Sequence, residues 1–390
     1  MCSLPWTGVF VNPDGQIKNC SISGENIGNI NQDSLEQILN NDANQAIRND
    51  MINGIKHARC NACYSVEENS KSKVNESNRT WYKKIAIKNS NMEIFDSSKS
   101  FELSVLDLRW RNTCNFACVY CGPDLSSKWA SMLSDDRWVI NEENLETSKQ
   151  YIFDQLKTVK HVYLAGGEPL LMKDNYELLQ RLYDVNPDVD IRINSNISNL
   201  NNPVFSQLQK FKNVKWTISV ESTGKTFEYM RWPGIWDEFV KNSQTIQQCV
   251  GNQINFNMVW CILNSFELFN TFDFLIQQGF HENMFIVQCL TDPTPLSILH
   301  LPPDHIENLK IEIVKRMKHA NPEWWLYKSL NSMYNFLNNP APEFRKNLQM
   351  SSCSPGIKGT IEFLKYVDNL RGGNESQSLF ETLYQIHDSL

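Results

Sequence analysis

Short apolar runs alternate with amphipathic segments between residues 103 and 290. Six runs have the length and composition of buried strands: 103–109, 161–165, 189–193, 214–220, 254–261 and 284–290. Helix-like segments separate them, near 143–158, 174–184, 203–211, 235–249 and 265–278. This repetition predicts parallel strands joined by right-handed crossovers. We therefore expect an α/β fold built on a partial (β/α)6 barrel, with its active site at the C-terminal ends of the strands.

Eleven cysteines are many for a chain of 390 residues, and seven of them form two local sets. One set follows the first predicted strand with the spacing C-x3-C-x2-C: Cys114, Cys118 and Cys121. The other lies near the N-terminus: Cys2, Cys20, Cys60 and Cys63. Residues 1–10 lack the charged region and long apolar stretch of a secretory signal. Short local spacings in such a chain favour metal ligands over disulfides.

The three-cysteine loop suits an iron–sulfur cluster, because thiolates are soft ligands that bind such clusters well. A cubane cluster has four irons, so three cysteines leave one iron able to bind a small molecule. Zinc is the alternative, but it needs a fourth ligand nearby. No His or Cys lies between Cys121 and His161, so that ligand would have to come from a distant part of the chain.

This loop, with Tyr120 before its last cysteine, resembles the radical SAM superfamily over about residues 103–290. The resemblance implies a catalytic 4Fe–4S cluster on the three cysteines and S-adenosylmethionine (SAM) as cofactor. Gly166-Gly167-Glu168 at the end of strand two is similar to the family's Gly-Gly-Glu motif, which takes the SAM amino group. Two glycines let a backbone approach a ligand closely, and a carboxylate pairs with an ammonium group.

Further cofactor-binding residues are implied by the same resemblance. Asn196 follows strand three, and Ser219 and Glu221 end strand four, where the family often has Ser-x-Asp at the ribose hydroxyls. Glu221 in place of Asp departs from that pattern. Arg231 stands where related enzymes often carry an arginine near the SAM carboxylate. The full set of SAM contacts we expect is Tyr120, Gly166, Gly167, Glu168, Asn196, Ser219, Glu221 and Arg231.

The four N-terminal cysteines resemble the twitch and SPASM class of auxiliary-cluster domains. Four thiolates can ligate one 4Fe–4S cluster completely, so the segment is similar to a twitch domain and implies a second cluster. A structural zinc ribbon is the alternative, because four cysteines with one C-x2-C also suit tetrahedral zinc. An N-terminal twitch before a radical SAM core is similar to a group of phage and marine bacterial proteins.

The composition along the chain predicts four parts. Residues 1–66 form the twitch-like domain, with a hairpin turning at 12–15 and a helix over 34–48. Residues 67–100 are polar and read as a linker, 101–295 form the radical SAM partial barrel, and 296–390 form a helical C-terminal extension.

The resemblance implies reductive cleavage of SAM to a 5′-deoxyadenosyl radical that abstracts hydrogen from a substrate. A peptide or protein is the favoured substrate, with a small metabolite or nucleotide as the alternative, and flavodoxin or ferredoxin would donate the electron. Cys261 and Cys289, near the ends of strands five and six, could return a hydrogen atom or act as small buried apolar residues. A non-catalytic iron–sulfur or zinc protein, serving in electron transfer or as an interaction module, is the competing hypothesis.

The composition bears on location and partners. No apolar run approaches the roughly 18–20 residues of a membrane-spanning helix. The net charge of −7 gives no support for nucleic-acid binding. We therefore expect a cytoplasmic protein, in the host cytoplasm if a phage encodes it.

Overall fold

The computed structural model describes residues 2–69, 77–89, 101–138, 140–340, 354 and 356–389. Contacts divide the chain into two compact units. Unit 1 comprises Met1–Cys114, Pro123–Ser195 and Asn199–Lys215, and unit 2 comprises Asn115–Gly122, Asn196–Ser198 and Trp216–Leu390.

Unit 1 contains six strands in the order β3-β2-β1-β4-β5-β6. Their bounds are β1 Gly8–Val11, β2 Gln16–Lys18, β3 Gly28–Asn29, β4 Val105–Leu108, β5 His161–Leu164 and β6 Asp190–Ser195. β1 and β2 form the predicted hairpin, turning through Gly15 at a φ of 81°. β1 also pairs in parallel with β4. The N-terminal segment therefore extends the parallel sheet of β4, β5 and β6 instead of folding apart from it.

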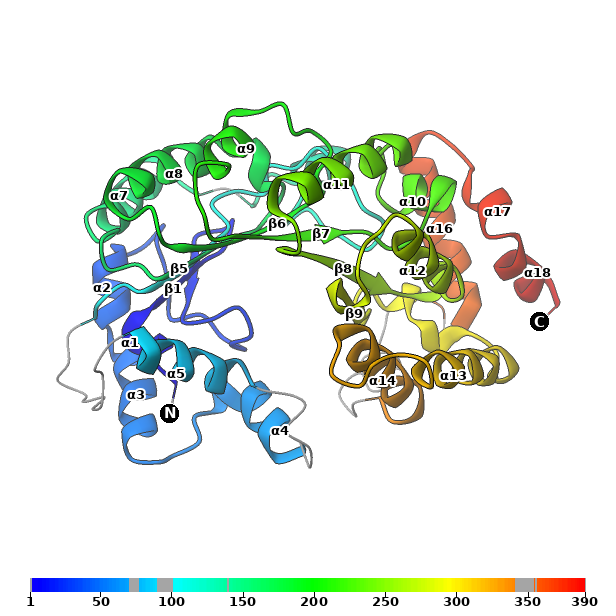
Figure 1. The fold of residues 1–390 in the computed structure, drawn as a ribbon, viewed down its shortest axis with the longest axis horizontal. Helices are drawn as coiled ribbons and strands as arrows, with labels where there is room; N and C mark the ends of the chain where they lie inside the picture. Colours follow the sequence, from blue (N-terminus) through cyan, green and yellow to red (C-terminus); the bar gives the residue numbers. More distant parts are fainter. Residues whose placement is uncertain are drawn as a thin grey trace. The chain divides into compact units, whose positions relative to one another are not determined.

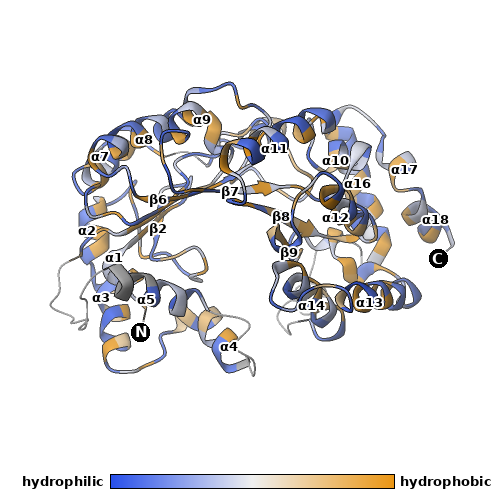
Figure 2. Cartoon of the chain, viewed as in Figure 1, coloured by the Kyte–Doolittle hydropathy of each residue, from blue (hydrophilic) through white to orange (hydrophobic). Residues whose placement is uncertain are grey.

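Helices cover both faces of this sheet (Figure 1). α7 (Glu142–Phe153), α8 (Lys173–Val185) and α9 (Pro203–Leu208) lie on one face, and α5 (Asn78–Asn89) lies on the other. α1 (Leu4–Thr7), α4 (Asn61–Asn69) and α6 (Ser127–Leu133) complete the unit together with the helical pair α2 and α3. The strands are largely hydrophobic, while the outward sides of α7 and α8 are hydrophilic, as expected for helices with one buried side (Figure 2).

The helix predicted over 34–48 is two helices, α2 (Leu35–Asn40) and α3 (Asp42–Ile52). Asn41 interrupts the pattern with an extended backbone, and its side chain accepts a hydrogen bond from the N–H of Asn44 to cap α3. Of the segment predicted as a linker, residues 78–89 form α5, and residues 70–76 and 90–100 lie outside the described part of the chain.

Unit 2 continues the strand–helix alternation with β7 (Val214–Ser219), β8 (Ile254–Trp260) and β9 (Phe285–Cys289), paired in parallel. β7 starts at the boundary, because its first two residues belong to unit 1. The α-helices in the described part of this unit are α10 Gly224–Met230, α11 Trp236–Val250, α12 Glu267–Gln277, α13 Pro303–Met317, α14 Trp325–Asn338, α16 Gly356–Arg371, α17 Ser376–Leu379 and α18 Glu381–Ser389. Ser329 of α14 accepts the Val287 N–H at 2.9 Å, which satisfies a backbone donor on the edge strand β9.

Short 3-10 helices connect several elements: η1 Ala58–Cys60, η2 Pro169–Leu171, η3 Ile262–Asn264, η4 Glu282–Met284, η5 Thr294–Leu296 and η6 Ile298–His300. The six predicted strands correspond to β4 through β9, and helices follow from residue 303 onward. The predicted α/β class, with a parallel sheet and a helical C-terminal region, is thereby confirmed.

Among the described helices, none combines the length and apolarity needed to cross a bilayer.

Candidate functional site

The Gly166-Gly167-Glu168 segment follows β5 in unit 1 and packs against the chain just before Cys114. The Glu168 N–H donates to the Thr113 carbonyl at 2.7 Å. A Cβ on Gly167 would lie 2.2 Å from that same oxygen, and Gly166 has a φ of +105°. In the structure these glycines allow the close approach of a neighbouring backbone, which fixes the start of the cysteine loop against the end of β5. Their contact with SAM stays a prediction.

Glu168 is buried, with 1% of its surface exposed. Its Oε1 accepts hydrogen bonds from Ser195 Oγ at 2.7 Å and from the Leu170 N–H at 3.1 Å. Ser195 is the last residue of β6, so two strand ends in unit 1 meet at this carboxylate. A buried carboxylate held in one orientation is suited to pairing with a ligand ammonium group.

Ser127 of α6 forms hydrogen bonds with both the backbone N–H and the backbone carbonyl of Cys114. Its N–H donates to Ser127 Oγ at 3.0 Å, and Ser127 Oγ donates to its carbonyl at 3.2 Å. Asn112 Nδ2 donates to the Pro123 carbonyl at 2.8 Å. These bonds tie the residues before Cys114 to those that follow the loop in unit 1.

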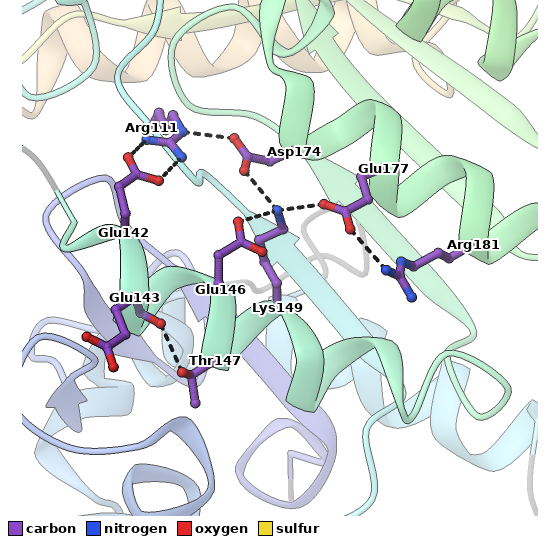
Figure 3. Close-up of polar contacts among 9 residues, drawn as sticks. All are labelled: Arg111, Glu142, Glu143, Glu146, Thr147, Lys149, Asp174, Glu177 and Arg181. Atoms are coloured by element: carbon purple, nitrogen blue, oxygen red, sulfur yellow. Dashed lines mark hydrogen bonds and ion pairs between the residues drawn. The ribbon is translucent and has the colours of Figure 1, made fainter.

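An ion-pair network holds the segment before Cys114 between α7 and α8 (Figure 3). Arg111 pairs with Glu142 at 2.6 and 2.8 Å and with Asp174 at 2.9 Å. Asp174 also accepts from Lys149, which is 3% exposed and contacts Glu177 at 2.7 Å. Asp174 thus joins two cations, so that the charges buried here compensate one another.

In unit 2, residues 115–122 carry Cys118 and Cys121 and pair with the chain after α10. The Ala117 N–H donates to the Trp232 carbonyl at 2.7 Å, and the Val119 N–H donates to the Met230 carbonyl at 2.8 Å. The Cys121 N–H donates to the Cys118 carbonyl at 2.9 Å. This backbone pairing holds the second and third cysteines in a defined turn.

Arg371, the last residue of α16, spans the same region. Its Nη2 donates to the Ala117 carbonyl at 2.7 Å, and its Nη1 donates to the Tyr229 carbonyl at 2.8 Å. Its guanidinium also lies 5.4 Å from the centre of the Trp232 ring. The sequence predicts no role for this arginine, and its place in the last turn of a helix is its only local signal.

Asn196, predicted to contact SAM, is buried and hydrogen-bonded to the cysteine loop within unit 2. Its Nδ2 donates to Asn115 Oδ1 at 3.0 Å, and its Oδ1 accepts the Ser198 N–H at 2.9 Å. Asn115 Nδ2 in turn donates to Ser198 Oγ at 2.9 Å. Asn196 therefore organises the loop, and its contact with SAM stays a prediction.

Arg231, Glu221 and Tyr120 meet beside Cys118. Arg231 Nη1 donates to Tyr120 Oη at 2.5 Å and to the two Glu221 oxygens at 3.2 and 3.0 Å. Arg231 and Glu221 are 5% and 1% exposed, so their ion pair is buried. The buried Nε of Arg231 has no hydrogen-bond partner among the described residues. A buried donor of this kind is expected to bind a group that the protein alone does not supply.

Burial raises the pKa of the Cys118 thiol, while the nearby Arg231 guanidinium and a hydrogen bond from Tyr120 lower it. Burial opposes the charge of Arg231, yet Cys118 and Glu221 hold its pKa well above the usual value. The arginine thus favours the thiolate form that an iron ligand needs. Ser219, the remaining predicted contact, ends β7 and is 9% exposed. The roles of Ser219, Glu221 and Arg231 at SAM stay predictions.

The four N-terminal cysteines line one pocket in unit 1, together with Leu4, Arg59 and Arg79. Burial raises the pKa of Cys2, and mutual repulsion with Cys20, Cys60 and Cys63 raises it further. Burial is also the main cause of the raised pKa of Cys20, about 11. Four thiols in one pocket, two of them buried and two partly buried, repel one another when charged and need a cationic centre to become thiolates together.

Backbone donors surround these sulfurs. The Leu4 N–H lowers the pKa of Cys2, and the Arg79 and Asn78 N–H groups lower that of Cys63. Asn78 and Arg79 begin the 12-residue helix α5, whose N-terminal dipole favours negative charge. The four cysteines and the backbone donors around them have the chemistry of a four-thiolate centre. As the side chains stand in this structure, however, no three His, Cys, Asp or Glu groups among the described residues are arranged to hold one metal ion, so a second centre stays a prediction.

Cys261 and Cys289 lie at the ends of β8 and β9, as expected. Burial raises the pKa of each thiol to about 12. Cys261 is completely buried, and Asn264 Oδ1 accepts its backbone N–H at 2.8 Å. Both residues are protonated at neutral pH, the form in which a thiol can give a hydrogen atom.

Two family models match the chain. Residues 110–262 match the Radical SAM superfamily, and residues 2–64 match SPASM, an iron–sulfur cluster-binding domain. Curated relatives include GTP 3′,8-cyclases. That of Nautilia profundicola is 34% identical over 83 residues, covering 21% of this chain and 24% of the relative. That of Xanthomonas campestris pv. campestris is 31% identical over 107 residues, covering 25% and 26%. The chain thus spans about a quarter of the length of these relatives.

The solved structures that match the chain have low sequence identity to it. Native anSMEcpe with bound AdoMet is 16% identical, with a TM-score of 0.41 and coverage of 61% of this chain and 62% of that one. Streptococcus suis SuiB bound to the precursor peptide SuiA is 16% identical, with a TM-score of 0.37 and coverage of 71% and 60%.

Proposed function

Because this chain belongs to the radical SAM superfamily and carries a SPASM-type iron–sulfur domain at its N-terminus, we propose that it cleaves SAM reductively. One electron from a ferredoxin or flavodoxin breaks the sulfonium C–S bond, giving methionine and a 5′-deoxyadenosyl radical. That radical takes a hydrogen atom from the substrate, leaving 5′-deoxyadenosine and a substrate radical. The iron–sulfur cluster supplies the electron and one open iron site when bound.

The chain's own residues would orient SAM. Cys114, Cys118 and Cys121 are the three ligands that we assign to this cluster. Glu168 would accept the SAM ammonium group, since its carboxylate is buried and fixed by Ser195. The unpartnered Nε of Arg231 is a candidate donor to a SAM oxygen.

The observation that carries this proposal is the ligand count. Within the segment matching the Radical SAM superfamily, the loop offers three cysteines, whereas the N-terminal pocket is lined by four. Complete thiolate ligation suits electron relay, whereas a missing ligand suits binding of SAM. We therefore assign SAM cleavage to the three-cysteine cluster and an auxiliary role to the other.

Formation of 5′-deoxyadenosine tests the proposal. Anaerobically reconstituted protein, reduced with dithionite and given SAM, is expected to release 5′-deoxyadenosine and methionine, measured by liquid chromatography. Cys118→Ala should abolish the product, and Cys249→Ala, at an exposed cysteine outside both sets, should not. A wild-type protein that loads iron but forms no 5′-deoxyadenosine would contradict the proposal.

Metal content distinguishes a second cluster from zinc at the N-terminal pocket. Two cubane clusters predict about eight irons per chain, falling to about four in Cys63→Ala. Zinc retained at one equivalent in wild type and lost in Cys63→Ala would favour the zinc ribbon instead.

For the substrate we favour a peptide or protein, following the resemblance of the N-terminal segment to SPASM-type domains. A nucleotide is the alternative, because the curated relatives, which match this chain along about a quarter of their own length, are named GTP 3′,8-cyclases. If the substrate is a peptide or protein, adding GTP should leave the rate of 5′-deoxyadenosine formation unchanged. A GTP-dependent increase with consumption of GTP would favour the nucleotide.

A further inference from the structure

A row of polar side chains crosses the face of the unit 1 sheet that α5 covers. The register pairs Asp107 of β4 with Tyr163 of β5, and Tyr163 with Arg192 of β6. Trp81 of α5 contacts Arg192, with the guanidinium 5.8 Å from the ring centre. Since Arg192 contacts Trp81 of α5 and side chains alternate along a strand, the paired residues of this row point to the side of the sheet that α5 covers.

Two cations lie together on this face without an anionic partner among the described residues. Arg192 makes no ion pair with any of them, and its Nε is buried without a hydrogen-bond partner. The Ile191 N–H donates to the Asn213 carbonyl at 2.8 Å, which sets the start of β7, with the partly buried Lys215, beside Arg192 on β6. Burial and repulsion from Arg192 both lower the pKa of Lys215, in agreement with this placement. Keeping two like charges together in a partly buried position is unfavourable unless a further group compensates them.

The charged groups in the described part of the chain do not supply that compensation. Asp107, the buried carboxylate of the row, pairs with Arg109 at 3.4 Å. Asp190 begins the same strand as Arg192 but is exposed and makes no ion pair with it. His161 is held neutral, because burial and then Arg192 lower its pKa to about 4. Three cations therefore face one buried carboxylate, in a chain of net charge −7.

We infer that Arg192 and Lys215 form a substrate subsite for an oxyanion, either a carboxylate or a phosphate. The inference rests on the proposed function, because it assigns the anion to the substrate of that radical reaction. Arg192 lies three residues before the C-terminal end of β6 at Ser195. That separation corresponds to about 10 Å along a strand, so one substrate can occupy the subsite while a reacting carbon lies nearer the strand ends. Trp81 and Tyr163 are the aromatic residues next to Arg192 on this face.

Direct binding of small oxyanions tests this subsite. Full-length reconstituted protein is titrated calorimetrically, without SAM or reductant, with inorganic phosphate in one series and N-acetylglutamate in another. We expect saturable binding of at least one probe. Arg192→Gln and Lys215→Gln should each raise its Kd roughly tenfold or more, and Arg192→Lys should restore much of the affinity.

Lys212→Gln is the matched control. Lys212 lies three residues before Lys215, but its side chain is exposed and pairs with Asp188. It removes the same charge and should leave binding unchanged. A preference for N-acetylglutamate identifies a peptide carboxylate as the anion, and a preference for phosphate identifies a nucleotide. Absence of saturable binding to wild type, or equal binding in Lys215→Gln and wild type, would overturn the inference. Because neither SAM nor reductant is present, the result is independent of whether the protein cleaves SAM.

Discussion

Within unit 2, the guanidinium of Arg231 lies beside the Cys118 thiol and pairs with the Glu221 carboxylate. The sequence motif located this arginine. Its buried ion pair with Glu221, which lies ten residues earlier in the chain, follows from no rule of sequence spacing. Gly167 is a similar case. The motif identified the residue, whereas its reason, the 2.2 Å approach of a Cβ to the Thr113 oxygen, required the fold.

Glu168→Gln tests the carboxylate assigned to SAM. Glutamine keeps the shape and can still accept from Ser195 but removes the charge that would pair with the SAM ammonium group. The Kd for SAM should rise roughly tenfold to a hundredfold, as measured by equilibrium dialysis with labelled SAM. Glu143→Gln, at an exposed glutamate of α7, is the control. Equal SAM affinity in Glu168→Gln and wild type would remove Glu168 from the site.

Gly167→Ala should destabilise the protein by roughly 2–3 kcal/mol, because the added methyl group overlaps a backbone oxygen that cannot move aside cheaply. Gly24→Ala, where a Cβ meets nothing within 4 Å, should change stability by no more than about 0.5 kcal/mol. Denaturant unfolding of the two variants provides the comparison. Identical unfolding midpoints would show that the approach of Gly167 to Thr113 is not a constraint.

At the scale of elements, hydrophobic runs predicted β4 through β9 closely, because buried parallel strands must be apolar along their length. The division of α2 from α3 was missed, since Asn41 lies within an otherwise helical pattern and acts as a cap. The role of α16 was also missed. Its contact with the cysteine loop joins Arg371 to Ala117, 254 residues away, and local patterns carry no information on such pairs.

Arg371→Gln should loosen the three-cysteine loop, because it removes the donors to the Ala117 and Tyr229 carbonyls. Iron release to a chelator should become biphasic, with about half of the iron lost roughly fivefold faster or more. Lys365→Gln, an exposed charge change on the same helix, is the control, and Arg371→Lys should rescue partly. Release kinetics identical to those of wild type would show that α16 does not support the loop.

At the scale of the whole molecule, the sequence was enough to predict the α/β class and the two cysteine sets. It did not predict that the N-terminal hairpin joins the parallel sheet through β1 and β4, because edge pairing between β1 and β4 leaves no periodic signal. The four N-terminal cysteines converge on one pocket from segments spread over residues 2–63. The proposed function assigns one centre to these four cysteines and a second, more reactive centre to the loop with three.

Electron paramagnetic resonance of the reduced protein tests this contrast most directly. SAM should shift the cluster signal in wild type and equally in a Cys20→Ala, Cys63→Ala double variant, which keeps only the three-cysteine cluster. Cys118→Ala, which retains the four N-terminal cysteines, should show a signal that SAM leaves unchanged. A SAM-induced shift that persists in Cys118→Ala, or that disappears in the double variant while its iron is retained, would contradict the assignment of SAM binding to the three-cysteine loop.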